Sequence, residues 1–233
     1  MSRRGTFWFG WALALVAMAG FARLGFWQYA RMQEKQALLA NVERVLRGPA
    51  VDIDAAGTAD LAWVEGQATI DARTLLLDNQ MRDGKPGVHV YCIARVGVAD
   101  RLVDLGWIAV KPDRTMPGAA CPQGPLHVRG LMTPLPSGGL RVGAPMQQLD
   151  GMRWLMARAD VDAIRSTLRI AVPARVIRLD PKLPVGYVRD LDVLPNTLPP
   201  ERHLGYAVQW WALSLAVFIT ALVLSIRKSK PNA

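Results

Sequence analysis

Residues 206–226 read YAVQWWALSLAVFITALVLSI, and this stretch decides the fold. It contains no charged residue, and its strongly polar side chains are Gln209, Ser214, Thr220 and Ser225. A helix of this length crosses the ~30 Å hydrocarbon core of a bilayer. Three basic residues follow, namely Arg227, Lys228 and Lys230. The sequence therefore predicts a transmembrane helix that ends in a basic tail.

A second apolar segment lies near the N-terminus, in residues 6–22, and continues as LGFW in residues 24–27. Arg3 and Arg4 precede it, and Arg23 is its only charge. A cleavable signal peptide is the alternative, because residues 17–19, Ala-Met-Ala, resemble a small-x-small cleavage site. Apolar and aromatic residues continue past that site, which favours a spanning helix with an interfacial belt.

Two spans place both termini on the same side of the membrane. The short basic ends favour the cytoplasm by the positive-inside tendency, whereas a long middle region is translocated largely regardless of its charge. We therefore expect a multi-pass protein of the bacterial inner membrane, with both termini cytoplasmic and the central domain periplasmic.

The chain of 233 residues has a net charge of +9, which suggests that it binds a negatively charged partner. Lys and Arg are scattered and no nucleic-acid motif occurs, so the charge suits anionic lipid headgroups or an acidic protein. We expect a lipid membrane as a partner and no nucleic acid.

The two cysteines, Cys92 and Cys121, are too far apart for a CxxC motif. They can pair in an oxidising compartment, or Cys92 can be a buried small hydrophobic residue.

Four regions follow along the chain. They are residues 1–29, the N-terminal transmembrane helix and its flank; 30–49, an amphipathic helical extension; 50–200, a β-rich periplasmic domain; and 201–233, the C-terminal transmembrane helix and basic tail. The extension has an apolar stripe at helical spacing, which we expect to pack on the outer domain. The stripe consists of Leu38, Leu39, Val42, Val45 and Leu46. Gly48-Pro49 ends the predicted helix.

From Leu61 onward, short runs rich in Val, Ile, Leu and Trp are separated by turn residues, which is typical of antiparallel strands. The predicted strands are Trp63–Ile70, Thr74–Leu77, Val88–Val96, Leu102–Val110, Leu126–Met132, Arg153–Ala157 and Ala174–Leu179. Residues 160–168 predict one short helix capped by Asp160. The fold class is thus a membrane protein with two transmembrane α-helices, one at each end, enclosing a β-rich α+β extracytoplasmic domain.

The sequence contains no GxSxG, HExxH, P-loop or dinucleotide motif, so we expect no enzymatic activity. Four carboxylates could be imagined as pairs, but they lie beside predicted turns or strand edges, where capping and solvation explain them. They are Glu65, Asp78, Asp83 and Asp104. His89 and His127 lie in predicted strands, where a lone imidazole is usually a hydrogen-bonded sheet or surface residue.

His203 has a different setting, one turn inside the predicted start of the C-terminal helix. Helical spacing aligns it with Tyr206, Ala207, Trp210 and Ser214. A neutral imidazole can ligate haem iron, and aromatic rings can stack on the macrocycle. The arginines expected to pair with the haem propionates are Arg202, Arg189 and Arg31. The alternative is an ordinary interfacial belt of aromatic residues with His203 as one more anchor.

Gln209 is a polar group in or near the membrane, and such groups usually face another helix or a cavity. The first span offers a small-residue surface suited to close helix approach, made of Gly10, Ala14, Ala17 and Gly20. Pairing of the two helices within the chain and contact with the helices of a partner explain these features equally well. We assign partner contact to Trp27, Gln28 and Gln209.

Four segments resemble motifs of a known family. Residues 24–35, LGFWQYARMQEK, are similar to an LGxWQxxRxxxK segment. Residues 76–80, LLDNQ, with two following glycines, resemble an LDNR turn in which Gln80 replaces the arginine. Residues 103–107, VDLGW, resemble a VNRGW strand, and residues 201–210, ERHLGYAVQW, are similar to a closing motif. In this order between two spans, the segments resemble the Surfeit locus protein 1 family of cytochrome c oxidase assembly factors.

The resemblance implies a role in assembling the aa3-type haem–copper oxidase. It implies transient binding of haem a and support for its insertion into the catalytic subunit, with His203 as the iron ligand. The implied partners are that catalytic subunit and the haem a synthase. A cofactor-free membrane scaffold that holds an oxidase subunit during assembly is the alternative.

Overall fold

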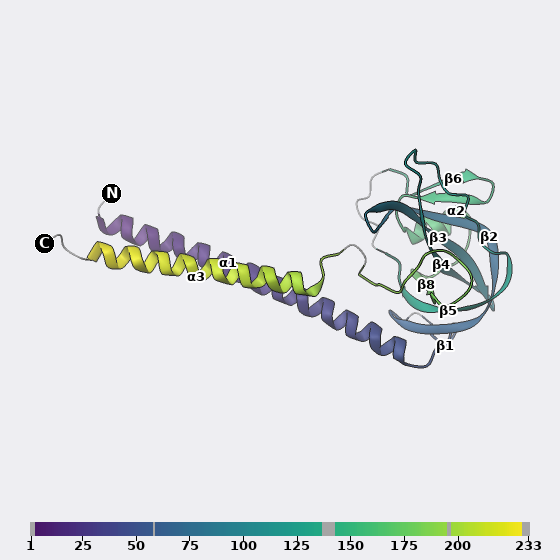
Figure 1. The fold of residues 1–233 in the computed structure, drawn as a ribbon, viewed down its shortest axis with the longest axis horizontal. Helices are drawn as coiled ribbons and strands as arrows, with labels where there is room; N and C mark the ends of the chain where they lie inside the picture. The colour runs from purple at the N-terminus through teal and green to yellow at the C-terminus, as the bar shows by residue number, and fades with distance from the viewer. Residues whose placement is uncertain (1–2, 58, 137–142, 195–196, 230–233) are drawn as a thin grey trace. The chain divides into compact units, whose positions relative to one another are not determined.

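The computed structural model describes residues 3–57, 59–136, 143–194 and 197–229. The chain divides into two compact units (Figure 1): a helical unit of residues 1–41 and 197–233, and a barrel unit of residues 42–196. Lys230 of the expected basic tail lies outside the described residues.

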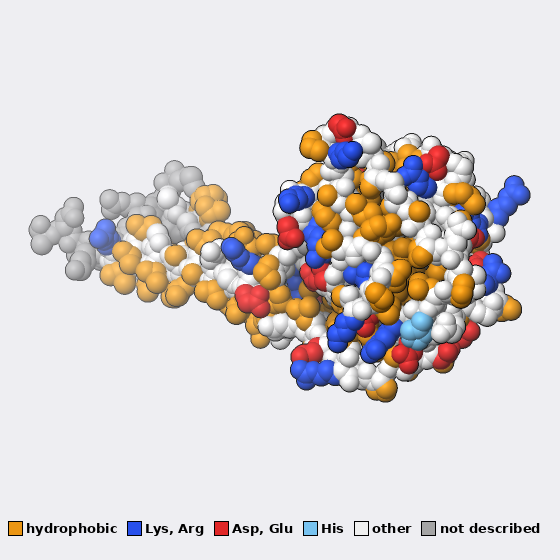
Figure 2. All heavy atoms as spheres, turned by 45° about the vertical axis from the view of Figure 1, so that its right-hand side comes forward, with side chains coloured by type: hydrophobic (Ala, Val, Ile, Leu, Met, Phe, Trp, Pro, Cys, Tyr) orange, Lys and Arg blue, Asp and Glu red, His pale blue; other side chains and the backbone are white. Residues whose placement is uncertain are grey.

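The helical unit is built from two long helices, α1 (Arg3–Arg47) and α3 (Pro200–Ser229). Both contain stretches long and apolar enough to cross a membrane, and few residues of these stretches are buried inside the protein. Hydrophobic side chains are abundant on the visible surface of the helices in Figure 2. Apolar helices that expose their side chains in this way suit lipid as their solvent. The predicted architecture of two transmembrane helices flanking a β-rich domain is confirmed.

The helices α1 and α3 run antiparallel and pack along a continuous seam. Its residues are at least partly buried and recur at steps of three or four, which is the heptad pattern of coiled coils. In α1 they are Trp11, Ala14, Met18, Phe21, Gly25, Gln28, Met32 and Lys35, and in α3 they are Pro200, His203, Ala207, Trp210, Ser214, Val217, Ala221 and Ser225. Two hydrogen bonds fix the register: Trp11 Nε1 donates to Ser225 Oγ at 2.9 Å, and Ser214 Oγ donates to the Met18 carbonyl at 3.1 Å.

The barrel unit contains eight strands and one short helix among its described residues. The strands are β1 (Val51–Asp52), β2 (Ala62–Arg82), β3 (Lys85–Val96), β4 (Ala99–Ala109), β5 (Gly124–Pro134), β6 (Met146–Asp150), β7 (Arg153–Met156) and β8 (Arg175–Leu179). The helix α2 (Val161–Leu168) is capped by the Asp160 carboxylate, which accepts from the backbone N–H groups of Asp162 and Ala163, as predicted.

Strand pairing closes a barrel. The order β3-β4-β8-β5-β2, together with the pairing of β2 with β3, joins five strands into a ring whose interior is filled by apolar side chains such as Val64, Val90 and Val103. The long strand β2 extends beyond the ring to pair with β7, which carries β6. A second apolar cluster packs α2 against β2, β3 and β7 through residues that include Ile164, Leu75 and Trp154.

The sheet is mixed: most pairings are antiparallel, as the sequence predicted, but three are not. Strand β1 pairs with β2, β4 with β8, and β2 with β7 in parallel, because the connections between these strands are long enough to return the chain to the same end of the sheet. The predicted strands Trp63–Ile70 and Thr74–Leu77 are one strand, β2, whose pairing with β3 shifts register between Ile70 and Thr74. Strands β1 and β6 were not predicted, since they are short and largely exposed.

Two features of the barrel unit resolve points that the sequence left open. Cys92 in β3 and Cys121 before β5 form a disulfide, and both are buried. The end of α1 packs on the barrel through Val42, Val45 and Leu46, which meet Trp63 and Leu131, whereas Leu38 and Leu39 of the expected stripe are exposed.

Candidate functional site

His203 lies in the first turn of α3, on the seam that faces α1. The helix starts at Pro200, whose fixed φ and missing N–H suit a first helical position. The His203 residue is only 8% exposed, and its Nδ1 lies 2.7 Å from the Oε1 of Gln28 in α1. The two side chains thus form a polar layer within the otherwise mostly apolar seam.

This hydrogen bond determines which ring nitrogen is free. An amide oxygen accepts only, so Nδ1 must carry the proton and donate it to Gln28. In a neutral imidazole the other nitrogen, Nε2, then bears the lone pair. The Nε2 atom is buried and has no hydrogen-bond partner among the described residues. The arrangement matches that of metal-binding histidines, in which one nitrogen donates to an oxygen while the other is directed at the metal.

Positive charge surrounds this layer. Lys35, three residues beyond Met32 on the seam, donates from Nζ to the carbonyl of Leu198, just before α3. Arg31 is exposed and forms an ion pair of 2.8 Å with Glu34. Both cations are near enough to act electrostatically on the His203 ring. An anionic group that approached the ring would therefore find favourable charge around it.

The structure brings some of the predicted site residues together and separates others. His203, Ala207, Trp210 and Ser214 share one face of α3, and this face is the seam against α1. Trp210 stacks on Phe21 of α1, with ring centroids 5.6 Å apart and an angle of 25° between the rings. Tyr206 is off this face and is 39% exposed.

The remaining predicted residues are mostly on the surface of the helical unit. Arg202, Gln209 and Trp27 are exposed, with Trp27 at 52%. Gln28, assigned to a partner, instead uses its amide oxygen within the chain to bind His203. Arg189 lies in the barrel unit, where its guanidinium donates to the backbone carbonyls of Asp180, Leu183 and Tyr187.

Trp211 belongs to the same helix pair and was not among the predicted site residues. Its indole lies directly over Gly25, where a Cβ atom would come within 2.3 Å of Nε1. The Phe26 and Tyr29 rings pack around it at centroid distances of 5.5 and 6.0 Å. The Nε1 atom is buried and has no partner among the described residues. The heptad spacing of α1, with Gly25 on the seam, is the signal that would have pointed to this contact.

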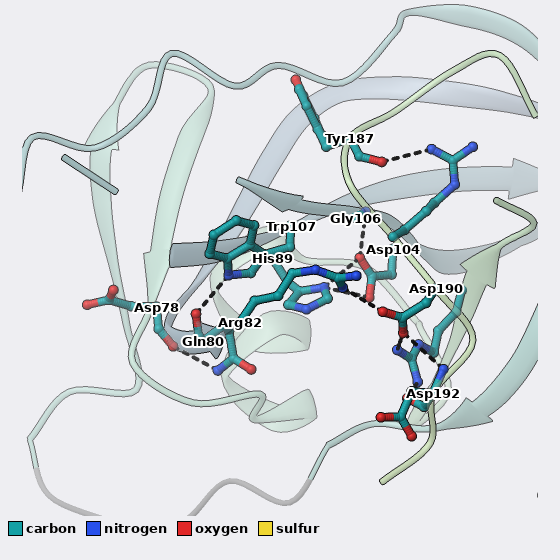
Figure 3. Close-up of polar contacts among 12 residues, drawn as sticks. Asp78, Gln80, Arg82, His89, Asp104, Gly106, Trp107, Tyr187, Asp190 and Asp192 are labelled. Atoms are coloured by element: carbon teal, nitrogen blue, oxygen red, sulfur yellow. Dashed lines mark hydrogen bonds and ion pairs between the residues drawn. The ribbon is translucent and has the colours of Figure 1, made fainter. Parts of the chain in front are cut away.

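The barrel unit carries a separate polar cluster, shown in Figure 3. His89 Nδ1 lies 3.0 Å from Oδ2 of Asp104. The other carboxylate oxygen, Oδ1, accepts from the backbone N–H of Gly106 at 2.8 Å. The interpretation of His89 as a hydrogen-bonded sheet residue is confirmed. Of the two roles expected for Asp104, capping and solvation, only the second is wrong, because the side chain is 7% exposed and accepts from these two donors.

The same cluster attaches the segment after β8 to the barrel. Arg82 forms a 2.6 Å ion pair with Asp190, while the backbone N–H of Trp107 donates to the Val188 carbonyl. Burial raises the pKa of Asp190, but hydrogen bonds from the Asp192 backbone and from Arg82 outweigh it, so the pKa lies below its usual value. Among the described residues no three His, Cys, Asp or Glu side chains gather as a metal site. The contacts of Asp104, the Arg82–Asp190 ion pair and the Trp107–Val188 hydrogen bond therefore stabilise the fold.

The four motif-like segments meet in pairs. Segment 24–35 supplies Gly25 and Gln28, which face Trp211 and His203 at the closing motif. In the barrel, Trp107 of segment 103–107 donates from its indole Nε1 to the backbone carbonyl of Gln80 at 2.7 Å. Because this bond uses a main-chain oxygen, the glutamine at position 80 leaves it intact.

The fold and the site define a two-span membrane protein with a β-barrel domain and a buried histidine between its helices. A model of the SURF1 family matches residues 15–215. The chain therefore belongs to the SURF1 family, the Surfeit locus protein 1 family of cytochrome oxidase assembly factors that its motifs resemble. This is a family of assembly factors and not of enzymes. None of the curated proteins matches this chain.

Proposed function

We propose that this protein assists assembly of an aa3-type cytochrome c oxidase by holding haem a transiently at His203 and supporting its insertion into the catalytic subunit. Haem a is here the cargo, and the protein needs no reaction of its own. The partners are the catalytic subunit of the oxidase and the haem a synthase that supplies the cargo.

One observation carries the proposal: the buried Nε2 of His203 has no partner in the described chain, while Gln28 holds the proton on Nδ1. An unpartnered buried nitrogen is unfavourable by about 1–3 kcal/mol, and ligation of iron would relieve that penalty. The described residues of the helical unit contain no second histidine. A single protein ligand suits a site that must release its cargo. Arg31, Lys35 and Arg202 supply positive charge for the two propionates of a haem.

The location in the bacterial inner membrane, with the barrel in the periplasm and both termini in the cytoplasm, has two supports. The Cys92–Cys121 disulfide suits an oxidising compartment such as the periplasm. The basic residues beyond the two apolar stretches, such as Arg3, Arg4 and Arg227, suit the cytoplasmic side. With that orientation, His203 lies 24 residues from Arg227, or about 36 Å along the helix, and thus at the outer headgroup level.

A second function is favoured by the seam itself. A polar pair in a heptad seam also fixes the register of two helices, as a single buried polar residue does in coiled coils. If Gln28 and His203 serve only this purpose, the protein is a cofactor-free scaffold that holds an oxidase subunit during assembly. The exposed Trp27 and Gln209 would then contact that subunit.

The test compares the wild type with His203→Ala, each purified from cells that make haem a. We expect a Soret band and a red-shifted α band in the wild type and their loss in the variant, with the far-UV circular dichroism unchanged. Colourless wild-type protein that co-purifies with the oxidase catalytic subunit would instead support the scaffold. Oxidase assembly that persists in cells carrying only His203→Ala would contradict a role for haem binding at His203.

A further inference from the structure

Two apolar grooves run along the helix pair, on the membrane side of His203. One, of about 510 Å³, is lined by Leu15, Met18, Ala19, Ala22, Trp211, Ser214, Leu215 and Phe218, and is called here the Trp211 groove. The other, of about 530 Å³, is lined by residues that include Trp11, Ala17, Ala216 and Thr220, and is called the Trp11 groove. Both lie within the apolar stretches of α1 and α3.

The Trp211 groove is the nearer of the two grooves to the His203 layer. Trp211, at its end nearest His203, lies over Gly25, which is less than one turn of α1 from Gln28. Its lining then follows α3 away from His203 as far as Phe218, over about 10 Å of helix. The groove therefore begins about two turns of α3 from His203 and extends toward the membrane interior.

The chemistry of the groove favours an apolar, chain-like occupant. Its one hydroxyl, on Ser214, is already used because it donates to the Met18 carbonyl. Its other side chains are aliphatic, aromatic or thioether groups, which gain dispersion energy from a close-fitting hydrocarbon. At the end near His203 the buried indole N–H of Trp211 lacks a partner among the described residues. A ligand with a polar group at the base of a hydrocarbon chain fits both features.

We propose that the Trp211 groove receives the isoprenoid tail of haem a and so gives the protein its preference for haem a over haem b. This inference rests on the proposed function. The tail begins with a hydroxyl-bearing carbon at the edge of the macrocycle and continues as hydrocarbon. With the iron at His203, the hydroxyl accepts from Trp211 Nε1 and the hydrocarbon lies along Ala19, Ala22 and Leu215. Haem b lacks this tail and leaves the groove to lipid.

The test is a titration of haem a and haem b into the full-length protein in nanodiscs, read by the Soret absorbance. We expect the wild type to bind haem a about tenfold more tightly than haem b, the discrimination that apolar contacts in a hydrophobic site commonly give. Ala19→Phe fills the groove and should lower the affinity for haem a to that for haem b, with no effect on haem b. Trp211→Phe keeps an aromatic ring but removes the N–H donor, and should reduce the preference partially.

Ala216→Phe is the matched control, because Ala216 is also an exposed alanine on the helix pair but lines the Trp11 groove. It should leave both affinities unchanged. Equal binding of the two haems by the wild type, or an Ala19→Phe variant that binds haem a as tightly as the wild type, overturns the assignment and leaves the groove to a lipid acyl chain. If both haems bind, and binding depends on His203 but not on the groove, the proposed function stands and the assignment of the groove fails. Failure to bind either haem overturns both proposals.

Discussion

The hydrogen bond between Gln28 and His203 should control how tightly haem is held. Gln28→Leu keeps the approximate size of the side chain but removes the oxygen that accepts from Nδ1 at 2.7 Å. The imidazole then loses the bond that fixes both its tautomer and its orientation. Nε2 no longer bears the lone pair in every molecule, so ligation of iron becomes weaker.

The structure bounds the size of this effect. Partners that orient a metal-binding histidine typically change metal affinity about 10- to 100-fold, which is roughly 1.4–2.8 kcal/mol. The pairing of the two helices should weaken less, by about 1 kcal/mol, which is the usual size of an interhelical hydrogen bond in a membrane. The loss of haem affinity should therefore exceed the loss of helix-pair stability.

The assay is a haem a titration of the purified protein, paired with thermal unfolding of the apo form. Gln28→Glu should bind haem at least as well as the wild type, because a carboxylate oxygen accepts from Nδ1 more strongly than an amide oxygen does. Gln33→Leu is the control for composition, since Gln33 is an exposed glutamine on the same helix. It should behave as the wild type in both measurements.

One result would refute this reasoning. If Gln28→Leu binds haem a within about twofold of the wild type while its helix pair is clearly destabilised, the bond fixes helix register and does not prepare a ligand. The second proposed function, the scaffold, would then account for the polar layer.

Three further predictions concern stability. Gly25→Ala should destabilise the helix pair by about 1–3 kcal/mol, because its methyl group would displace the indole packed over it, whereas Gly20→Ala, with open space around it, should not; intrinsic tryptophan fluorescence during thermal unfolding checks both. Cys121→Ser should lower the free energy of unfolding of the barrel by about 3–4 kcal/mol, the loop-entropy value for a separation of 29 residues, and urea unfolding with and without reductant should show the wild type shifting to match the variant. The hydrogen bond from Arg73 lowers the pKa of Asp71 below 3.8, so this carboxylate stabilises the barrel above about pH 4 and the contribution is lost as the pH falls through the folded-state pKa. Asp71→Asn should therefore be less stable than the wild type at pH 7, and the difference should shrink as the pH falls below 4; a difference that does not shrink in acid would contradict the assignment.

The sequence predicted those parts of the site that depend on neighbouring residues in the chain, and missed those that depend on contacts between distant residues. His203 was singled out because its position at a helix start and beside apolar residues is a local property. Its partner Gln28 lies 175 residues away, and only the pairing of α1 with α3 brings the two together. Trp211 was missed as a site residue for the same reason, since its neighbour Gly25 looks like an ordinary helix residue until the other helix is placed on it.

The barrel shows the same limit in the β-rich region. Alternating apolar residues predicted most strands, but not that Trp63–Ile70 and Thr74–Leu77 are one bent strand. Nor could it predict that β4 and β8 pair in parallel to close the ring. These outcomes depend on contacts between distant segments, whose free energy is absent from any short window of sequence. Solvation was expected for Asp104 because its donor His89, on the neighbouring strand, meets it only in the folded sheet.

The sequence by itself determined the two membrane spans, the β-rich domain between them, the capped helix α2 and the place of His203 near the start of α3. Length, apolarity and helix-start signals act over a few turns of chain and need no partner to be recognised. The tertiary structure alone decided that the predicted face of α3 is a seam against α1, that Cys92 bonds Cys121, and that one nitrogen of His203 is left without a partner. Each of these depends on which distant groups meet, because burial and hydrogen-bond satisfaction are properties of the packed chain.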